Sequence, residues 1–554
     1  MRGDSEEVCD RLSQAKLLKH FLRDVRLSDM MTVYWSERTE EHSYGIYCAL
    51  VPSEKVESAL DDPGWDLMHG SGLPGAIVRY DGAEQRVEYH RYGDDSGVEP
   101  LVIDRFFHGI FPDYRELREE FRLFHNLFHE RKQDQYLKFD ETGNEELIAT
   151  VEPHRIQVRL KEVLQFLAIK DMYLALFFDC AEHSEKTLGE LGLTQGSSQN
   201  RADLSCWSLG YGDYGGIGSL QAFSRLLGKR FFKPLPKEKS GFWGFAEEAK
   251  EYVDFIIGVN DQGDPITHTS NPDLLANFFG ANPGAPNYLT PVHFRKQVLD
   301  KYYSQPGKFQ VEDSTLRCGG LWLMTMDNHH NDRVVAWLGD LGRDLPYQEQ
   351  LHWRSQNILP TGTVSRTFFK RQVMGEFTDS ERPEHIFQEK YMELGEASQE
   401  RLDWSVLLPL APEDMYHTRC LRVPSRDEQK DFDELIQSLT KILIDSLNER
   451  ALNCLLPADM VAEIKGSISR LEAVLKGRDA EGYESHVAFL RDLQDFRSSG
   501  VAHRKGSNYR KMTEKFHLRD ESLSAVFSGM LGKGIEVLDF LITSVRNGTF
   551  DSRG

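Results

Sequence analysis

Residues 489–505 read Phe489-Leu-Arg-Asp-Leu-Gln-Asp-Phe-Arg-Ser-Ser-Gly-Val-Ala-His-Arg-Lys505. Arg497 lies one turn beyond Leu493, Gly500 weakens the helix just after it, and His503 follows. The apolar residues recur at steps of three and four, which predicts an amphipathic helix with one face packed on a core; they are Phe489, Leu490, Leu493 and Phe496. The stretch therefore predicts a helix end that places an arginine before a histidine-bearing segment.

The segment that follows this helix is strongly basic. Residues 497–519 carry a net charge of +6, with Glu514 opposing seven cations: Arg497, Arg504, Lys505, Arg510, Lys511, Lys515 and Arg519. An imidazole can transfer protons near neutral pH and a guanidinium can bind a phosphate, which together suffice for RNA cleavage without a metal. The alternative is a solvated basic loop that balances acidic neighbours. We expect catalytic roles for Arg497 and His503, and RNA contacts from Arg504, Lys505, Arg510 and Lys511.

Length and composition indicate an ordinary globular protein of two or three domains. The 554 residues exceed what one hydrophobic core normally serves. No apolar run approaches the roughly 20 residues of a membrane helix, and the seven cysteines form no C-x-x-C pair. We therefore expect a cytoplasmic protein with reduced thiols that neither is secreted nor spans a membrane.

The charge is distributed unevenly along the chain. The net charge of -22 disfavours a nucleic-acid partner for the chain as a whole, because an acidic protein repels phosphate. From Pro424 to the end, however, the chain holds 19 basic and 21 acidic residues, so residues 1–423 carry almost all of the excess. An RNA contact is therefore expected only from the C-terminal part.

The pattern of elements predicts a mixed α/β protein with a C-terminal helical bundle. Residues 1–180 combine short strands with helices, which include 114–132 and 155–170, and residues 181–423 form a central α/β or β-rich regulatory domain. Residues 424–554 read as an all-α bundle of four helices. Its first helix is expected to open with a capping box from Ser425 to Glu428, its second at Pro457, its third to span 483–496 and its fourth to run from Leu523 towards residue 547.

The C-terminal bundle resembles the HEPN superfamily, whose signature is an arginine, four to six residues, and then a histidine near the end of the third helix. Here Arg497 and His503 fit that signature with Ser-Ser-Gly-Val-Ala between them. Arg118/His125, Arg122/His129 and Arg510/His517 have compatible spacing, but only Arg497/His503 ends the third of four expected helices. The resemblance covers about residues 424–554.

The resemblance implies a metal-independent endoribonuclease in which His503 acts as general acid or base and Arg497 stabilises charge on the phosphate. It implies RNA as the partner, possible tRNA or mRNA targets, and a two-fold homodimer or higher homo-oligomer that brings both residues together. It also implies a toxin-like role in bacterial abortive infection against phage, with the remainder of the chain as a sensor of a phage-derived trigger. We expect neither a cofactor nor a metal.

Two other classes of function remain open. The bundle could be a non-catalytic module that binds RNA or nucleotides, because Ser498 stands where active members of the superfamily usually carry Asn, Asp or His. Alternatively, the central region could be a nucleotide-dependent enzyme that uses the glycine-rich turn at 210–218. Gly210-Tyr-Gly-Asp-Tyr-Gly215 satisfies G-x-G-x-x-G between an expected strand and an expected helix at 219–227, although a flexible turn is the better interpretation.

Two histidine-containing patterns have metal-ligand spacing, but each has a simpler interpretation. His125 and His129 are four residues apart on the expected helix 114–132, and they are better explained as core or surface histidines. The polar run 327–332 follows an apolar strand and includes Asp327, His329 and His330. We interpret this run as a turn rather than a metal site.

Overall fold

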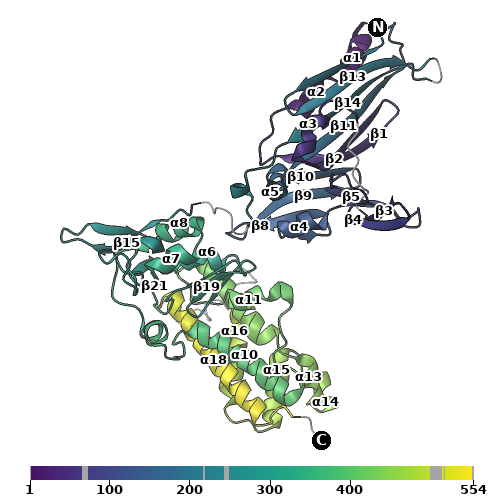
Figure 1. The fold of residues 1–554 in the computed structure, drawn as a ribbon. Coiled ribbons are helices and arrows are strands. Elements are labelled where there is room, and N and C mark those ends of the chain that lie inside the picture. The colour runs from purple at the N-terminus through teal and green to yellow at the C-terminus, as the bar shows by residue number, and fades with distance from the viewer. Residues whose placement is uncertain are drawn as a thin grey trace. The chain divides into compact units, whose positions relative to one another are not determined.

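The structure is a computed structural model of the 554-residue chain, and it describes residues 2–64, 73–215, 219–242, 249–498, 514–516, 518 and 520–551. The chain forms two compact units (Figure 1). Unit 1 comprises residues 1–140 and 144–249, and unit 2 comprises residues 141–143 and 250–554. The expected mixture of helices and strands is confirmed: unit 1 holds a large antiparallel sheet, and helices dominate the C-terminal part of unit 2.

Unit 1 is organised around a ten-stranded antiparallel sheet with the strand order β12-β13-β14-β11-β2-β1-β10-β9-β8-β7. Successive side chains of a strand point to opposite faces, so the apolar run of β11 supplies both faces of this sheet. The strands are β1 (Met30–Arg38), β2 (His42–Pro52), β7 (Phe128–Glu130), β8 (Gln135–Phe139), β9 (Glu145–Glu152), β10 (Arg155–Arg159), β11 (Met172–Ser184), β12 (Gly196–Ala202), β13 (Ser205–Asp213) and β14 (Ala222–Phe232).

Short helices cover both faces of this sheet. On one face, Phe21 of α2 stacks on Phe178 of β11 with ring centroids 4.4 Å apart. On the other face, Phe177 belongs to a core cluster with Val56 and Ala59 of α3. The helices are α1 (Arg2–Ser13), α2 (Ala15–Leu22), α3 (Val56–Ala59), α4 (Glu119–Phe124) and α5 (Leu160–Lys170).

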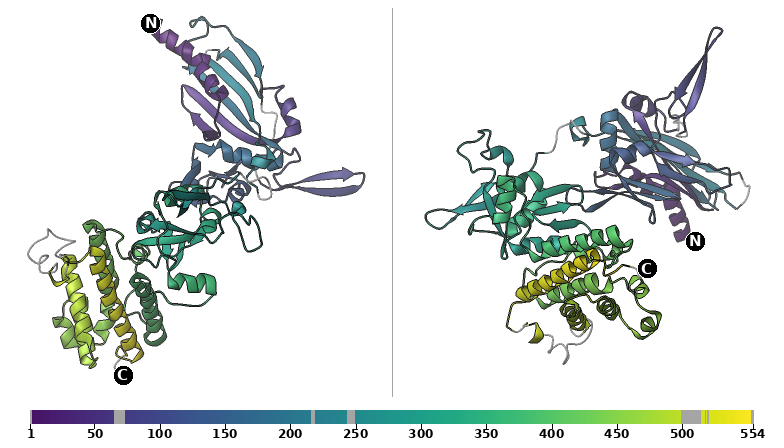
Figure 2. Two further views of the ribbon diagram at one scale, coloured as in Figure 1. Left: turned by 90° about the vertical axis from the view of Figure 1, so that its left-hand side faces the viewer. Right: turned by 90° about the horizontal axis from the view of Figure 1, so that it is seen from below.

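Two further hairpins complete the strands described for unit 1. β5 (Val102–Arg105) pairs with β6 (Tyr114–Leu117), and β3 (Gly75–Asp81) pairs with β4 (Glu84–His90). The β3–β4 hairpin projects from the unit (Figure 2).

Three helices expected in unit 1 are wrong in whole or in part. Of residues 114–132, only 119–124 form a helix, because the residues on either side pair into β6 and β7. Residues 155–159 form β10, in which the buried Ile156 and Val158 alternate with more exposed residues. The expected helix at 219–227 lies mostly in β14, where buried residues also alternate. In each case pairing with a neighbouring strand determines the conformation, although the apolar residues have helical spacing.

The first part of unit 2 combines three small antiparallel sheets with short helices around one core cluster. The sheets contain β15 (Asp254–Val259) with β16 (Pro265–Thr269); β17 (Pro291–Arg295) with β21 (Arg333–Trp337) and β22 (Asn357–Ile358); and β18 (Phe309–Glu312) with β19 (Thr315–Cys318) and β20 (Trp322–Thr325). The helices are α6 (Asp300–Tyr303), α7 (Leu338–Asp344), α8 (Tyr347–Ser355) and α9 (Arg366–Phe369).

The second part of unit 2 is helical and has a single apolar core that extends from Phe387 to Phe550. α10 packs alongside α18 (Figures 1 and 2), and Gly534 allows the close approach, because a Cβ there would lie 3.0 Å from the Phe387 ring. The helices are α10 (Pro383–Leu402), α11 (Tyr416–Arg419), α12 (Gln429–Thr440) continued by the π-helix η7 (Lys441–Asp445), α13 (Glu449–Cys454), α14 (Ala458–Glu463), α15 (Ser467–Gly477), α16 (Tyr483–Phe496) and α18 (Leu523–Arg546).

The expected third and fourth helices of the bundle are confirmed as α16 and α18. The first helix begins later than expected, with Glu428 at its N-cap, and Ser425 Oγ instead donates to Asp300. The expected second helix is broken at residues 464–466 into α14 and α15, where Gly466 adopts a φ of 88°. Among the helices that the structure describes, none combines the length and apolarity needed to cross a membrane.

Candidate functional site

The buried face of α16 fixes the position of Arg497. Leu490, Leu493 and Phe496 lie in the bundle core, and Phe496 contacts Phe432 of α12 edge to face. Arg497 follows directly, with its backbone still in the right-handed helical region. The fold therefore places the guanidinium at the C-terminal end of a rigidly packed helix.

Arg497 forms an ion pair with Asp445, the last residue of η7. Its Nη1 lies 2.6 Å from Asp445 Oδ2, and the two side chains are 27% and 41% exposed. The pair joins two helix ends that are 52 residues apart in sequence. Sequence patterns did not indicate Asp445, because nothing local to either helix end reveals which residues meet there.

The other residues expected at this site lie in residues 499–513, outside the part of the chain that the structure describes. They are His503, Arg504, Lys505, Arg510 and Lys511. The structure therefore describes Arg497 alone of the expected arginine–histidine pair.

The described residues on the far side of that segment return to the same end of α16. Lys515 Nζ lies 2.6 Å from Asp492 Oδ1 on α16, and the Phe516 ring contacts the Phe496 ring edge to face with centroids 5.7 Å apart. The residues before and after segment 499–513 therefore both lie near the C-terminal end of α16.

The two histidines expected at helical spacing do not share a helix. His125 follows α4 and is buried, with its Nε2 2.8 Å from the carbonyl oxygen of Glu162, and burial lowers the pKa of His125 to about 4. His129 lies in β7, where its Nε2 is 2.9 Å from Asp134 Oδ1. Their interpretation as core and surface histidines fits these contacts.

The glycine-rich turn does not connect a strand to a helix. Gly210 and Gly212 lie within β13, which pairs antiparallel with β14 along its length. The dinucleotide fingerprint requires a helix N-terminus after the glycines to receive the pyrophosphate. The described residues of this hairpin provide none, since residues 222–232 form a strand.

The polar run at 327–332 forms a loop after β20, in which Asp327 and Asn328 are buried. Ser365 donates to the carboxylate of Asp327 from its backbone N–H at 2.6 Å and from its hydroxyl at 2.8 Å. Burial raises the pKa of Asp327, but the bonds from His330 and Ser365 outweigh it and lower the pKa below its ordinary value. Asp327 therefore holds this loop to the segment that contains Ser365.

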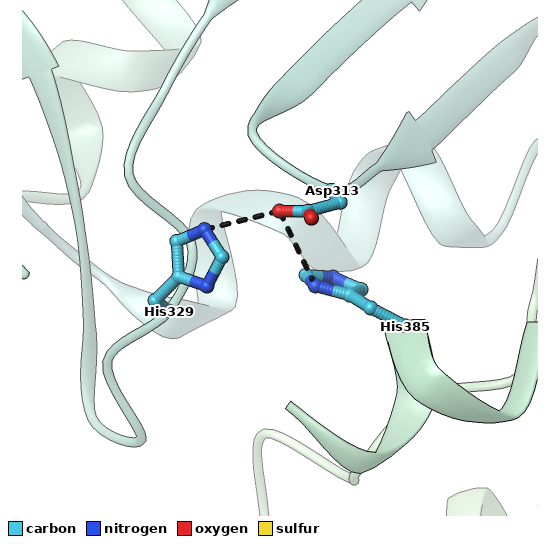
Figure 3. A group of neighbouring side chains, drawn as sticks. All are labelled: Asp313, His329 and His385. Carbon is cyan, nitrogen blue, oxygen red and sulfur yellow. Dashed lines mark ion pairs between the residues drawn. The ribbon is translucent and has the colours of Figure 1, made fainter. Parts of the chain in front are cut away.

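One residue of this loop, His329, belongs to a cluster that the sequence did not reveal (Figure 3). His329 Nε2 lies 3.0 Å and His385 Nδ1 lies 3.5 Å from Asp313 Oδ1. Burial lowers the pKa of His385 to about 4, which makes its imidazole neutral at physiological pH. Burial raises the pKa of Asp313, but hydrogen bonds from His329 and Arg371 outweigh it and hold that pKa well below its usual range.

The cluster adjoins a cavity of about 720 Å³ in unit 2. Asp313, Ser380 and His385 form part of its wall, and much of the remainder is apolar, including Phe387, Met392 and Leu410. The wall comes from three segments that are far apart in the sequence, 310–313, 380–392 and 409–421, which explains why no local motif indicated it.

Comparison of the chain with protein-family models, with curated proteins and with solved structures gave no match in any of the three searches.

Proposed function

We propose that the protein is a metal-independent endoribonuclease in which Arg497 and His503 carry the reaction. The observation that supports this most directly is the geometry around the end of α16. A helix with one buried face holds Arg497, and the described residues on both sides of the histidine-bearing segment lie at this same helix end. The segment is basic, which favours an RNA phosphate as the group recognised there.

The proposed reaction needs one group that moves a proton and one that stabilises negative charge. His503 takes the proton from a ribose 2′-hydroxyl, and the 2′-oxygen attacks the adjacent phosphorus as the bond from phosphorus to the 5′-oxygen breaks. The products are a 2′,3′-cyclic phosphate and a 5′-hydroxyl, which receives a proton. Arg497 stabilises the charge that develops on the phosphate oxygens.

A two-fold homodimer fits this chemistry, because it supplies two histidines, one to remove a proton and one to return it. Arg504, Lys505, Arg510 and Lys511 provide charge for the RNA backbone, with tRNA or mRNA as the target.

The proposed biology is a toxin-like effector of abortive infection against phage, restrained by the rest of the chain until a phage-derived trigger appears. An active ribonuclease harms its own cell, so such an enzyme needs a restraint. Residues 1–423 carry almost all of the net negative charge. Residues 1–423 are acidic, as an RNA backbone is, and in this proposal they compete with RNA for the basic segment.

The test is cleavage of total RNA and of tRNA in EDTA by an excess of the purified full-length protein, so that the basal activity of a restrained enzyme is detected. Arg497→Ala and His503→Ala are expected to abolish cleavage. Arg491→Ala is the matched control, because Arg491 lies six residues earlier on α16, forms an exposed ion pair with Glu472, and changes the charge equally.

Cleavage that survives both substitutions would contradict the proposed site and direct attention to Arg510 and His517. Tight RNA binding without cleavage by wild type, unchanged in His503→Ala, would favour the non-catalytic RNA-binding module.

A further inference from the structure

Asp313, His329 and His385 bring three ligand-type atoms within 4.8 Å of one another. Asp313 lies in the turn between β18 and β19, His329 in the loop after β20, and His385 in the first turn of α10 (Figure 3). The two histidine side chains are 4% and 8% exposed, and that of Asp313 is 27% exposed. Three separate segments of unit 2 thus converge on one point that is largely shielded from solvent.

We propose that this cluster binds one divalent first-row transition metal, with Zn²⁺ as the first candidate, through Asp313 Oδ1, His329 Nε2 and His385 Nδ1. A tetrahedral zinc site with bonds of about 2.0–2.2 Å places neighbouring ligand atoms roughly 3.3–3.5 Å apart. The two observed separations from Asp313 Oδ1, 3.0 and 3.5 Å, are close to this value. Small side-chain adjustments therefore suffice to admit the ion.

Surrounding residues fix the carboxylate ligand. Arg371 Nη1 lies 2.7 Å from Asp313 Oδ2, so Oδ2 is occupied and Oδ1 faces the histidines. Asn328 holds the turn from both sides, since it accepts a hydrogen bond from the Ser314 N–H and donates one to the carbonyl oxygen of Glu312. Such outer contacts typically orient the ligands of a metal site.

Serine hydroxyls occupy the space between the ligands. Ser314 Oγ lies 2.9 Å from His329 Nε2, and Ser380 Oγ lies 2.9 Å from His385 Nδ1. Ser314 adopts a φ of 63°, a left-handed conformation that costs free energy for a residue other than glycine. Each hydroxyl contacts the histidine nitrogen that would bind the metal. Either hydroxyl can therefore rotate to accept a hydrogen bond from a metal-bound water.

The ligand set determines the class of metal. Two imidazoles and one carboxylate suit Zn²⁺ and related first-row ions, whereas Mg²⁺ and Ca²⁺ prefer oxygen ligands alone.

The site has three protein ligands and borders a large cavity. Metal sites that keep an open position for water or a small molecule commonly have three protein ligands, while purely structural zinc sites have four. Asp313 and His385 line the cavity of about 720 Å³. The fourth position is therefore open to a small molecule with a metal-binding group and an apolar body.

The test uses the untagged full-length protein, stripped with a chelator and dialysed against Zn²⁺ or Co²⁺. We expect one equivalent of Zn²⁺ per chain, a rise in the melting temperature of unit 2 with Zn²⁺, and Co²⁺ absorption bands without thiolate charge transfer. His329→Gln and His385→Gln are expected to weaken binding at least about tenfold. His268→Gln, a partly buried histidine elsewhere in unit 2, should bind as wild type does.

Binding of less than one equivalent by wild type, thiolate bands in the Co²⁺ spectrum, or unchanged affinity in both histidine variants would each overturn the proposal. The Co²⁺ spectrum of wild type decides the ligand type even where a variant fails to fold. Arg497→Ala should still bind the metal, so the experiment tests the metal site independently of the proposed ribonuclease activity.

Discussion

Asp445→Asn removes the negative charge that pairs with Arg497 while keeping the size of the side chain. Both partners are partly exposed and the contact is 2.6 Å. Ion pairs at such positions contribute about 0.2–1 kcal/mol to folding. The free energy of unfolding is therefore expected to fall by no more than about 1 kcal/mol.

The same substitution should increase the rate of RNA cleavage. If Arg497 must exchange Asp445 for an RNA phosphate, the pair stabilises the free enzyme by up to about 1 kcal/mol. Since 1.36 kcal/mol corresponds to tenfold, releasing Arg497 should raise the rate by at most about fivefold. Single-turnover cleavage in EDTA, with protein in excess, and urea denaturation of the same samples measure both effects.

Glu472→Gln is the control, because it releases Arg491 on the same helix and should leave cleavage unchanged. A decrease of tenfold or more in Asp445→Asn, with stability preserved, would refute the competition. Asp445 would then be a residue that positions Arg497 for the reaction.

Four further outcomes are expected. Phe496→Ala should lower the free energy of unfolding of unit 2 by about 3–5 kcal/mol in urea titrations, because the ring is fully buried between aromatic neighbours. His125 has a pKa of about 4 in the folded state, below its unfolded value. Its contribution to the free energy of unfolding is therefore complete above about pH 6.5, and up to about 3 kcal/mol of it is lost as the pH falls towards 4. Calorimetry should show a weaker dependence of stability on pH in His125→Gln. A panel of nucleotides should leave the melting temperature unchanged, because the glycine-rich turn lies in a hairpin of strands; stabilisation by any of them would favour the nucleotide-dependent alternative. A fragment spanning 424–554 should aggregate more than one spanning 379–554 by light scattering, because the shorter piece lacks core residues Phe387, Leu394 and Ala397.

Local periodicity correctly predicted the elements whose conformation depends least on the segments that they pack against. The bounds of α16 and α18 follow from long apolar stripes at helical spacing that end at clear polar boundaries. Where a strand's partner decides the outcome, as at 155–159, the same reasoning gave a helix instead.

The candidate sites depend on contacts across long stretches of sequence. Arg497 was predictable because it ends an amphipathic helix, but its partner Asp445 was not. His329 lies in a polar run that is visible in the sequence. Asp313 lies in a turn and His385 in the first turn of a helix, and neither had a local signal. Only the packing of β18, the loop after β20 and α10 brings the three together.

The most direct measurement is end-group analysis of RNA cut by the full-length protein in EDTA. The proposed chemistry predicts 2′,3′-cyclic phosphates and 5′-hydroxyl ends, lost in His503→Ala and in substrates with a 2′-deoxyribose at the cleaved position. Fragments with 3′-hydroxyl and 5′-phosphate ends, or cleavage that EDTA abolishes, would contradict it.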